Sequence, residues 1–355
     1  MIASAQNEMY ETRSLLCTIE RIRLSREVGK LPVFSMNEQS VKVSSLTEPG
    51  IADRDVSDLE VFDLDASPSF FLGCAVWAFK DWVGHFYPAK SQPTDFLRLY
   101  SERLRTVEGN TTFYSVPTLE TIQRWRSNTP KGFQFCPKLP RSVTHEGALM
   151  SHLSEALSFL DLMNGLGDRL GPVMVQLPPS YGPSSMSDLA EFLTALTSKS
   201  IAIAVEVRHL GWFEEKISVQ LNALLMRLKV GRVLLDSRSM YDWEAEGDAD
   251  PQLSSNRRKP KVPLQPVVTA DYAVVRYISH PMLLRNHDYL TGWVSQIDRW
   301  LSEGKHIYFF VHCPKEEESP AVVRYLQRQL ESADVSVPPL PWNQLAQPPN
   351  QLSLF

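Results

Sequence analysis

Charged and polar residues stand at the ends of short apolar runs throughout the middle of this sequence. The run 201–208 shows the pattern best, because Ile201 and Ile203 begin a β-branched phase while the alternate phase ends in Glu206 and Arg208. The matching phase of the other runs ends in Glu108, Asn110, Lys138, Gln176, Asp236, Arg276 and His312. Carboxylates placed beside cations and amides can transfer protons or hold an anionic group.

These residues must be positioned by the strands that the apolar runs predict. The eight runs are Phe70 to Trp77, Thr106 to Asn110, Phe133 to Lys138, Val173 to Leu177, Ile201 to Arg208, Arg232 to Asp236, Tyr272 to Ile278 and Ile307 to His312. The segments between them carry helical periodicity, as in Leu189, Phe192, Leu193 and Leu196. Strand and helix alternating eight times predict an α/β fold, a single (β/α)8 barrel of the TIM type. An open doubly wound sheet is the alternative, but FLGCAVWAF stands where that fold places its GxGxxG motif.

In a barrel, one phase of each strand faces the lumen, and the strand C-terminal ends hold the chemistry. We therefore expect Glu108, Asn110, Lys138, Gln176, Glu206, Arg208, Asp236, Arg276 and His312 to converge in one cleft. A self-satisfied ion network that plugs the barrel is the structural alternative.

Three carboxylates are the catalytic candidates of this cleft. Glu206 would act as general acid or base, its pKa raised by burial and by Glu108 or Asp236. The cations Lys138, Arg208, Arg276 and Arg238 suit a small anionic or polyhydroxy ligand, and Asn110, Gln176, His312 and Trp77 complete the predicted binding set. For Trp77, core packing is the alternative to a stacking wall. Hydrolysis of a phosphate- or sugar-containing substrate and ligand binding without turnover both stay open.

Composition limits the partners and cofactors. A net charge of -5 gives no footprint for duplex nucleic acid, although the basic group at 257–261 leaves direct nucleic-acid binding open. There is no apolar run of the roughly 20 residues that span a bilayer, and the start lacks a signal-peptide pattern, so we expect a soluble cytoplasmic protein. No cofactor is predicted. A divalent metal stays open because His209, His280 and His312 accompany the carboxylates without tight spacing. The cysteines, without a CxxC pair, are expected to be buried reduced thiols.

Three zones divide the chain. Residues 1–65 read as a mostly irregular extension, 68–335 as the barrel and 336–355 as an extended, Pro-rich tail. The stretch 237–271 is too long for an ordinary loop and is expected to be a functional insertion or to hold further structure.

Motifs along the body resemble the YecE-like family, or domain of unknown function 72. They are GCAVWAFKDWVGHFYP, TVEGNTTFYSVP, RWRSNTPKGFQFCPKLPRSVTH, VQLPPS, VEVRHLGWF and RYISH. The resemblance implies a TIM-type barrel and no assigned activity. Members often end the last strand with an amide-rich Asn-Asn-Asp corner, where this chain has HCPKEEESP.

The last five residues, QLSLF, resemble the pentapeptide by which bacterial replication and repair proteins dock on the DNA polymerase sliding clamp. Leu352, Leu354 and Phe355 offer apolar anchors, Gln351 offers an amide, and the preceding Pro-rich stretch supplies reach. A fold-back of these residues onto the barrel is the alternative. The resemblance implies that the sliding clamp is a partner.

Overall fold

The computed structural model describes residues 69–241 and 259–345. Predictions that concern residues 1–65, Cys17, Arg257, Arg258 and the final pentapeptide lie outside the described residues.

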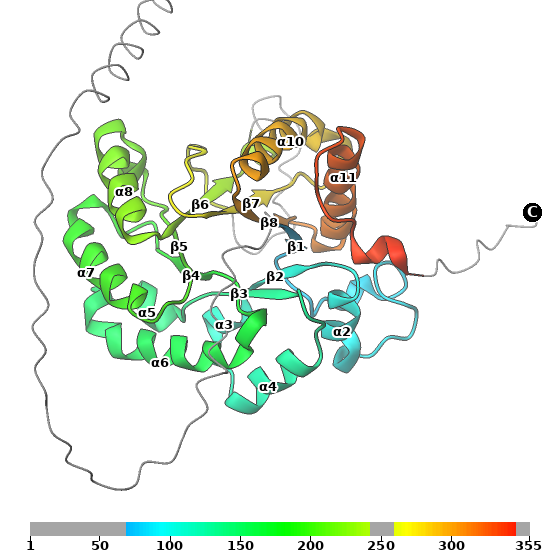
Figure 1. The fold of residues 1–355 in the computed structure, drawn as a ribbon, viewed down its shortest axis with the longest axis horizontal. Helices are drawn as coiled ribbons and strands as arrows, with labels where there is room; N and C mark the ends of the chain where they lie inside the picture. The colour runs from blue at the N-terminus through cyan, green and yellow to red at the C-terminus, as the bar shows by residue number, and fades with distance from the viewer. Residues whose placement is uncertain (1–68, 242–258, 346–355) are drawn as a thin grey trace, which may run out of the picture. The chain divides into compact units, whose positions relative to one another are not determined.

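Eight parallel strands form the centre of the fold (Figure 1). They are β1 Phe70–Cys74, β2 Thr106–Gly109, β3 Gln134–Pro137, β4 Val173–Gln176, β5 Ile203–Glu206, β6 Gly231–Asp236, β7 Tyr272–Ile278 and β8 His306–His312. Hydrogen bonding runs in the order β3-β2-β1-β8-β7-β6-β5-β4. The last gap, between β3 and β4, is bridged where the amide of Leu139 donates to the carbonyl of Met174 at 3.0 Å. The predicted TIM-type barrel is confirmed, with strands near their expected positions.

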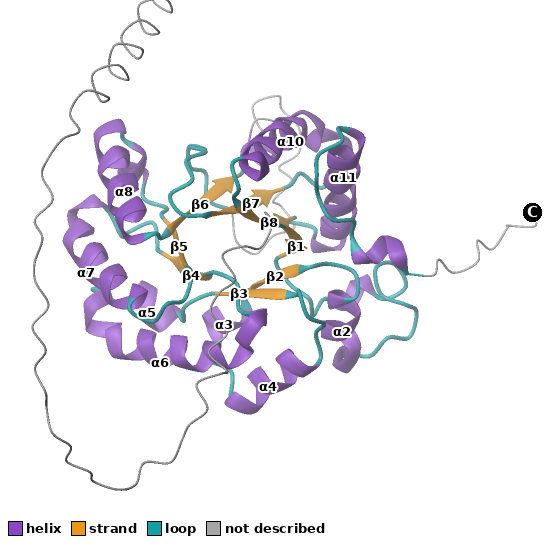
Figure 2. Ribbon diagram, viewed as in Figure 1, coloured by secondary structure: helices purple, strands orange, loops and turns teal. Residues whose placement is uncertain are grey.

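Helices surround this barrel, as Figure 2 shows. They are α2 Phe96–Ser101, α3 Thr111–Tyr114, α4 Leu119–Ser127, α5 Arg141–His145, α6 Leu153–Met163, α7 Met186–Thr197, α8 Glu215–Leu228, α9 Arg238–Tyr241, α10 His287–Ser302 and α11 Ser319–Ser332. The longer ones bury one apolar face on the strands: in α7, Leu189, Phe192, Leu193 and Leu196 are fully buried. The short helices α3, α5 and α9 follow β2, β3 and β6 directly, so they stand at the rim where a barrel holds its site.

The two strand phases pack into separate cores. The outer phase joins the helices in a large cluster that includes Cys74, Phe135 and Val205. The inner phase fills the lumen with a smaller apolar cluster of Cys136, Met174, Ala204, Val233, Val274, Tyr308 and Phe310. Cys74, Cys136 and Cys313 are buried free thiols, as expected. This apolar cluster shares the inner strand phase with the polar residues at the strand ends. Its low dielectric strengthens the electrostatic interactions of those residues.

The Pro-rich C-terminal stretch is packed up to residue 345, which corrects the extended tail expected from residue 336. Leu340 is buried, and the amide of Trp342 donates to the carbonyl of Arg103 at 3.1 Å. The guanidinium of Arg324 lies over the Trp342 ring, 3.7 Å from its centroid. Apolar anchors among the prolines thus outweigh the extended preference of the composition.

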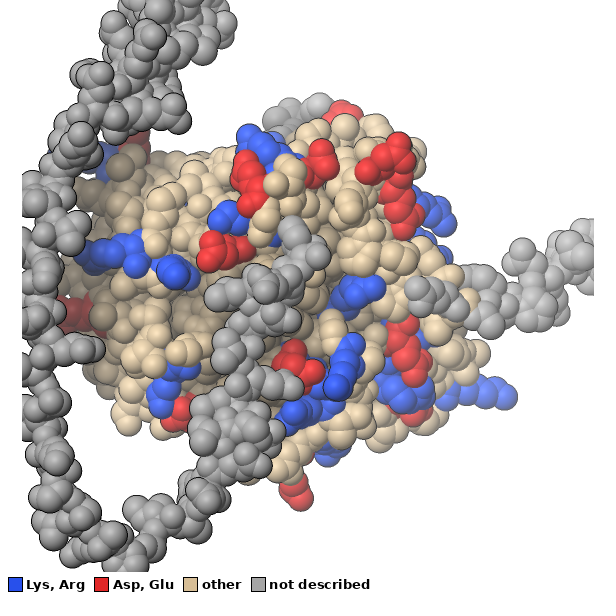
Figure 3. Space-filling model, in the orientation of Figure 1, with Lys and Arg blue, Asp and Glu red and all other residues tan. Residues whose placement is uncertain are grey.

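Among residues 69–241 and 259–345, no helix is both long and apolar enough to cross a membrane. On the face drawn in Figure 3, basic and acidic side chains are mixed.

Gly73 in β1 is required by the close approach of β2. A Cβ at this position would stand 2.0 Å from the backbone oxygen of Thr106. We expect Gly73→Ala to lower the free energy of unfolding by about 3 kcal/mol or more, because the obstacle is backbone. Gly292 in α10 is the matched control: a Cβ there meets nothing within 4 Å, and Gly292→Ala should stabilise by about 0.5–1 kcal/mol. Urea unfolding of both variants checks the pair, and equal stabilities would contradict it.

Candidate functional site

Glu108, at the end of β2, is the centre of a buried ion-pair cluster at the barrel mouth. Its Oε1 lies 2.6 Å from the Nζ of Lys138, which follows β3. Its Oε2 accepts from the Nε of Arg276 on β7 at 2.8 Å and from the Nε2 of His312 on β8 at 2.6 Å. One carboxylate therefore joins residues from four strand ends.

Glu206, at the end of β5, is the second carboxylate of the cluster. Its Oε2 accepts from the Nη1 of Arg276 at 2.5 Å, and its Oε1 accepts from the Nε of Arg208 at 2.5 Å. The Nζ of Lys138 also donates to the Oε1 of Gln176 on β4 at 2.8 Å. We call Glu108, Lys138, Gln176, Glu206, Arg208, Arg276 and His312 the ion-pair cluster. It contains three cations, Lys138, Arg208 and Arg276, against two carboxylates.

Both carboxylates are ionised, although neither is exposed to solvent. Burial alone would raise the pKa of Glu206, but Arg208, Arg276 and Lys138 outweigh it and lower the pKa to about 2. The pKa of Glu108 is also lowered well below its usual value, because Arg276, His312 and Lys138 outweigh burial. The expectation of a raised Glu206 pKa was wrong, because the lowering effect of Arg208, Arg276 and Lys138 outweighs both burial and the raising effect of Glu108.

Two groups of the cluster lose protons more readily than usual. Burial and Arg276 lower the pKa of Lys138 to about 8, against the opposing effect of Glu108. Burial likewise lowers the pKa of His312 to about 3, despite Glu108. At neutral pH, His312 is therefore uncharged and donates its Nε2 proton to Glu108, whereas Lys138 is largely protonated.

A cleft of about 480 Å³, the mouth cleft, opens above the ion-pair cluster. Its cationic lining is Lys138, Arg141, Arg208, Lys259 and Arg276. No Asp or Glu belongs to the lining that the structure describes. Glu108 and Glu206 are fully buried and pair with cations that do line the cleft, such as Lys138 and Arg208. The other polar lining residues are Asn110, Tyr114, His145, Gln176 and His312. An electropositive cleft of this volume is suited to a small anionic ligand.

Most of the predicted site residues converge here. Asn110, Lys138, Gln176, Arg208, Arg276 and His312 line the mouth cleft, and Glu108 and Glu206 support it. The predicted self-satisfied network is also present in part, since every charge of the cluster has a partner. The three-to-two excess of cations leaves room for an anion.

Asp236 and Arg238 lie outside the cluster, so the expected convergence was wrong for Asp236, and Arg238 does not join the other cations of the predicted ligand set. Asp236 Oδ2 accepts from the indole nitrogen of Trp293 on α10 at 2.8 Å, and its Oδ1 accepts from Arg238 Nε at 2.9 Å. The lumen phase of β6 is instead that of Val233, which belongs to the inner apolar cluster. Asp236 therefore pairs with Trp293 of the outer helix α10 and not with a residue in the barrel lumen.

Trp77 packs in the outer core instead of lining the mouth cleft. Its ring packs edge-on against the rings of Trp125 and Phe135, with centroid separations of 5.3 Å and 6.1 Å. His209 and His280 accept hydrogen bonds from nearby backbone amides. Within the described ranges, no group of three or more His, Cys, Asp or Glu side chains is arranged to hold a metal ion.

Sequence reasoning missed several residues that line the mouth cleft: Phe113, Tyr114, Arg141, His145 and Ile278. The first four belong to α3 and α5, the short helices directly after β2 and β3. Their position immediately after a strand end could have indicated that they lie at the barrel mouth. The insertion contributes Lys259 and Pro260 to the same cleft.

Fold and site together define a class: a (β/α)8 barrel with a buried ion-pair cluster beneath an electropositive mouth cleft. The family model described as "Protein of unknown function DUF72" matches residues 71–345. The chain belongs to this family, as its motifs indicated.

Relatives agree with this assignment. The UPF0759 protein YecE of Escherichia coli K12 is 31% identical over 261 residues, which cover 73% of this chain and 92% of the relative. A solved DUF72 family protein from Enterococcus faecalis V583 matches with a TM-score of 0.56 at 15% identity, covering 74% of this chain and 98% of that one. One from Thermotoga maritima MSB8 matches with a TM-score of 0.55 at 20% identity, covering 74% and 99%. At these identities, the solved structures support the fold alone.

Proposed function

We propose that the mouth cleft binds the phosphate group of a small ligand. The observation that carries the proposal is the lining of five cations, with no carboxylate among the lining residues that the structure describes. The side chains of Lys138 and Arg276 are nearly buried and that of Arg208 is 16% exposed, so a bound oxyanion would be shielded from water. Charge-assisted hydrogen bonds from guanidinium and ammonium groups are strong in such surroundings.

We extend the proposal to hydrolysis of the phosphate-containing ligand. An incoming phosphate competes with Glu206 for Arg208, which frees a carboxylate oxygen to take a proton from an attacking water. The water oxygen bonds to phosphorus, the bond to the leaving oxygen breaks, and Lys138 supplies the proton that this oxygen needs. Lys138 fits the role because its pKa of about 8 lies near neutrality.

The test combines a substrate screen with the Glu206→Gln variant. Purified protein is assayed against phosphoesters, nucleotides and glycosides, with and without divalent metal. We expect hydrolysis of a phosphate-containing compound by the wild type, and its loss with retained binding in Glu206→Gln. Binding without hydrolysis by the wild type would overturn the hydrolase.

A binding or adaptor protein without turnover is the second candidate. The observation in its favour is that both glutamates are held by cations, with lowered pKa values, so neither is a strong base in the free protein. Under this function, Glu206→Gln would alter affinity alone.

We further propose that the C-terminal pentapeptide, Gln351 to Phe355, tethers the barrel to the DNA polymerase sliding clamp. Support comes from its sequence, QLSLF. Fluorescence titration of the full chain against purified clamp should give a dissociation constant at or below roughly tens of micromolar, in the range of short apolar anchors. A Leu354→Ala, Phe355→Ala double variant should lose this binding. Equal affinity of the two proteins would exclude the tether.

Phosphate affinity should fall as pH rises through the pKa of Lys138, about 8. Deprotonation removes a cation that contacts the ligand, so the affinity falls by up to about tenfold per pH unit above this pKa. Titration calorimetry with inorganic phosphate from about pH 7.5 to about pH 9.5 checks the slope. In Lys138→Arg the charge at this position persists, so the fall should be shallower than in the wild type, although Lys259, whose pKa burial also lowers, still lines the cleft. A steep profile in that variant would show that another group titrates.

A further inference from the structure

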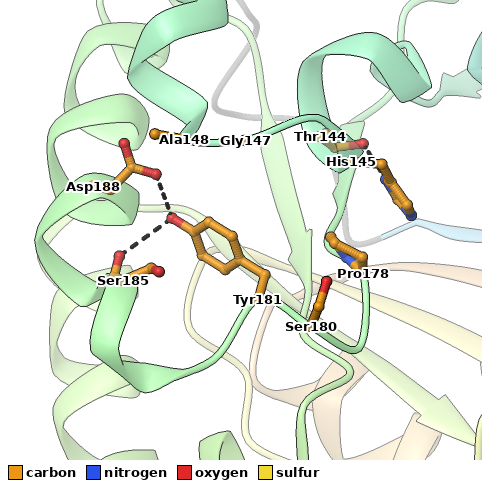
Figure 4. Close-up of a pocket in the computed structure, with 9 residues that line it drawn as sticks. All are labelled: Thr144, His145, Gly147, Ala148, Pro178, Ser180, Tyr181, Ser185 and Asp188. Atoms are coloured by element: carbon orange, nitrogen blue, oxygen red, sulfur yellow. Dashed lines mark hydrogen bonds between the residues drawn. The ribbon is translucent and has the colours of Figure 1, made fainter.

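A second cleft, the side cleft, adjoins the mouth cleft and has a volume of about 330 Å³. Figure 4 shows that its walls come from α5 and the residues after it, from the loop after β4, and from the start of α7. The two clefts share His145 as a lining residue. They therefore meet at the C-terminal end of α5, with Arg141 at the other end of that helix lining the mouth cleft.

The side cleft has the opposite electrostatic character to the mouth cleft. No Lys or Arg belongs to its described lining, which includes one carboxylate, Asp188. Asp188 is held in place, because its oxygens accept from the backbone amides of Leu149 at 2.8 Å and Met150 at 3.1 Å, and from the Tyr181 hydroxyl at 2.8 Å. This fixed negative charge disfavours a second phosphate.

Hydroxyl groups give the side cleft its polar character. Ser180 is exposed and Ser185 is half-buried, and both line the cleft. Neither hydroxyl forms a hydrogen bond to another group among the residues that the structure describes. Hydroxyls and a fixed carboxylate acceptor are groups that pair with the hydroxyls of a neutral polyhydroxy molecule.

His145 stands where the two parts of a ligand would join. Burial, followed by Arg208 and Arg141, lowers its pKa to about 4, so the ring is neutral at pH 7. The Thr144 hydroxyl lies 2.8 Å from its Nδ1 and 3.5 Å from the Pro140 carbonyl. In the tautomer in which Nδ1 accepts this hydroxyl proton, Nε2–H is a donor for a ligand oxygen.

We propose that the two clefts form one ligand site for a phosphorylated sugar, with the phosphate in the mouth cleft and the sugar in the side cleft. This proposal rests on the phosphate site proposed above and specifies its substrate class. It explains why an electropositive cleft and a hydroxyl-lined cleft with one fixed carboxylate share the lining residue His145.

The test compares inorganic phosphate with ribose 5-phosphate, glucose 6-phosphate and glucose 1-phosphate by titration calorimetry. At least one sugar phosphate should bind about tenfold or more tightly than inorganic phosphate, through its added hydroxyl contacts. Ser180→Tyr places a ring in the side cleft and should remove this gain while leaving inorganic phosphate affinity unchanged. The matched control is Ser184→Tyr, because Ser184 is exposed but does not line the cleft.

The outcomes separate the two proposals. Saturable binding of inorganic phosphate with no gain from any of the three sugars would overturn the shared site and leave the phosphate site standing. If Ser180→Tyr still bound a sugar phosphate more tightly than inorganic phosphate, the sugar would lie outside the side cleft, and the shared site would also be overturned. Absence of binding by inorganic phosphate and all three sugar phosphates would overturn both.

Discussion

Replacement of Glu108 with glutamine is expected to lower the free energy of unfolding by about 3–5 kcal/mol, the usual cost of breaking a buried ion pair. Glu108 is fully buried and contacts Lys138, Arg276 and His312. Glutamine keeps the volume but removes the charge, so Lys138 and one side of Arg276, both nearly buried, lose their counterion. Urea unfolding followed by circular dichroism measures the change.

The matched control is the exposed pair of Asp161 and Lys199. Their side chains are 2.7 Å apart, at 61% and 32% exposure. Asp161→Asn should therefore cost less than about 1 kcal/mol. If Glu108→Gln proved as mild as Asp161→Asn, the ion-pair cluster would not be the structural centre of the barrel mouth.

The second large effect concerns ligand affinity. Arg208→Gln is expected to weaken binding of inorganic phosphate by about 10- to 100-fold, the loss that follows removal of one strong charge-assisted contact. Arg208 lines the mouth cleft and is held by Glu206 from the end of β5. The variant leaves Glu206 Oε1 without its cationic partner, while Oε2 keeps Arg276, and the less compensated carboxylate adds repulsion to the lost contact.

Arg238 offers an unusually close control. It pairs with Asp236 at the end of β6, just as Arg208 pairs with Glu206 at the end of β5, and in both cases the partner is two residues earlier. Arg238 does not line the mouth cleft. Arg238→Gln should therefore leave phosphate affinity unchanged. Similar losses in both arginine variants would indicate a diffuse electrostatic effect and no defined site.

The sequence was sufficient to predict much of this site because most strands are chemically two-sided. In β5, Val205 packs against the helices while Ala204 and Glu206 face inward, and the alternation is visible in the residue types. The same logic predicted the positions of Lys138 and Arg276.

The prediction failed on β6, where both faces are buried and the charged residues lie in the outer phase, while the inner phase is apolar, with Val233 and Leu235. Arg232 and Asp236 share the outer phase with Leu234, and Arg232 Nη1 donates to Asn222 on α8 at 2.8 Å. A polar residue in a strand therefore indicates the lumen-facing phase only where the surrounding helices offer it no polar partner. The sequence does not reveal such partners before the helices are placed.

The residues after the strands were the harder part. Arg141 and His145 belong to a five-residue helix whose orientation depends on the turn that follows β3. Likewise, the direction of the Glu206 pKa shift depends on which charges lie within a few ångströms, and residue spacing does not give that distance. The convergence of most strand-end residues at the barrel mouth was therefore predictable from the sequence. The protonation state of Glu206 and the existence of the side cleft were not.

The most direct test of the phosphate site is a crystal structure of the protein grown with sodium tungstate, a heavy oxyanion whose anomalous signal locates it. We expect tungstate in the mouth cleft, with oxygens about 2.7–3.2 Å from the Arg208 guanidinium and the Lys138 ammonium. An empty mouth cleft with tungstate bound elsewhere on the barrel would contradict it.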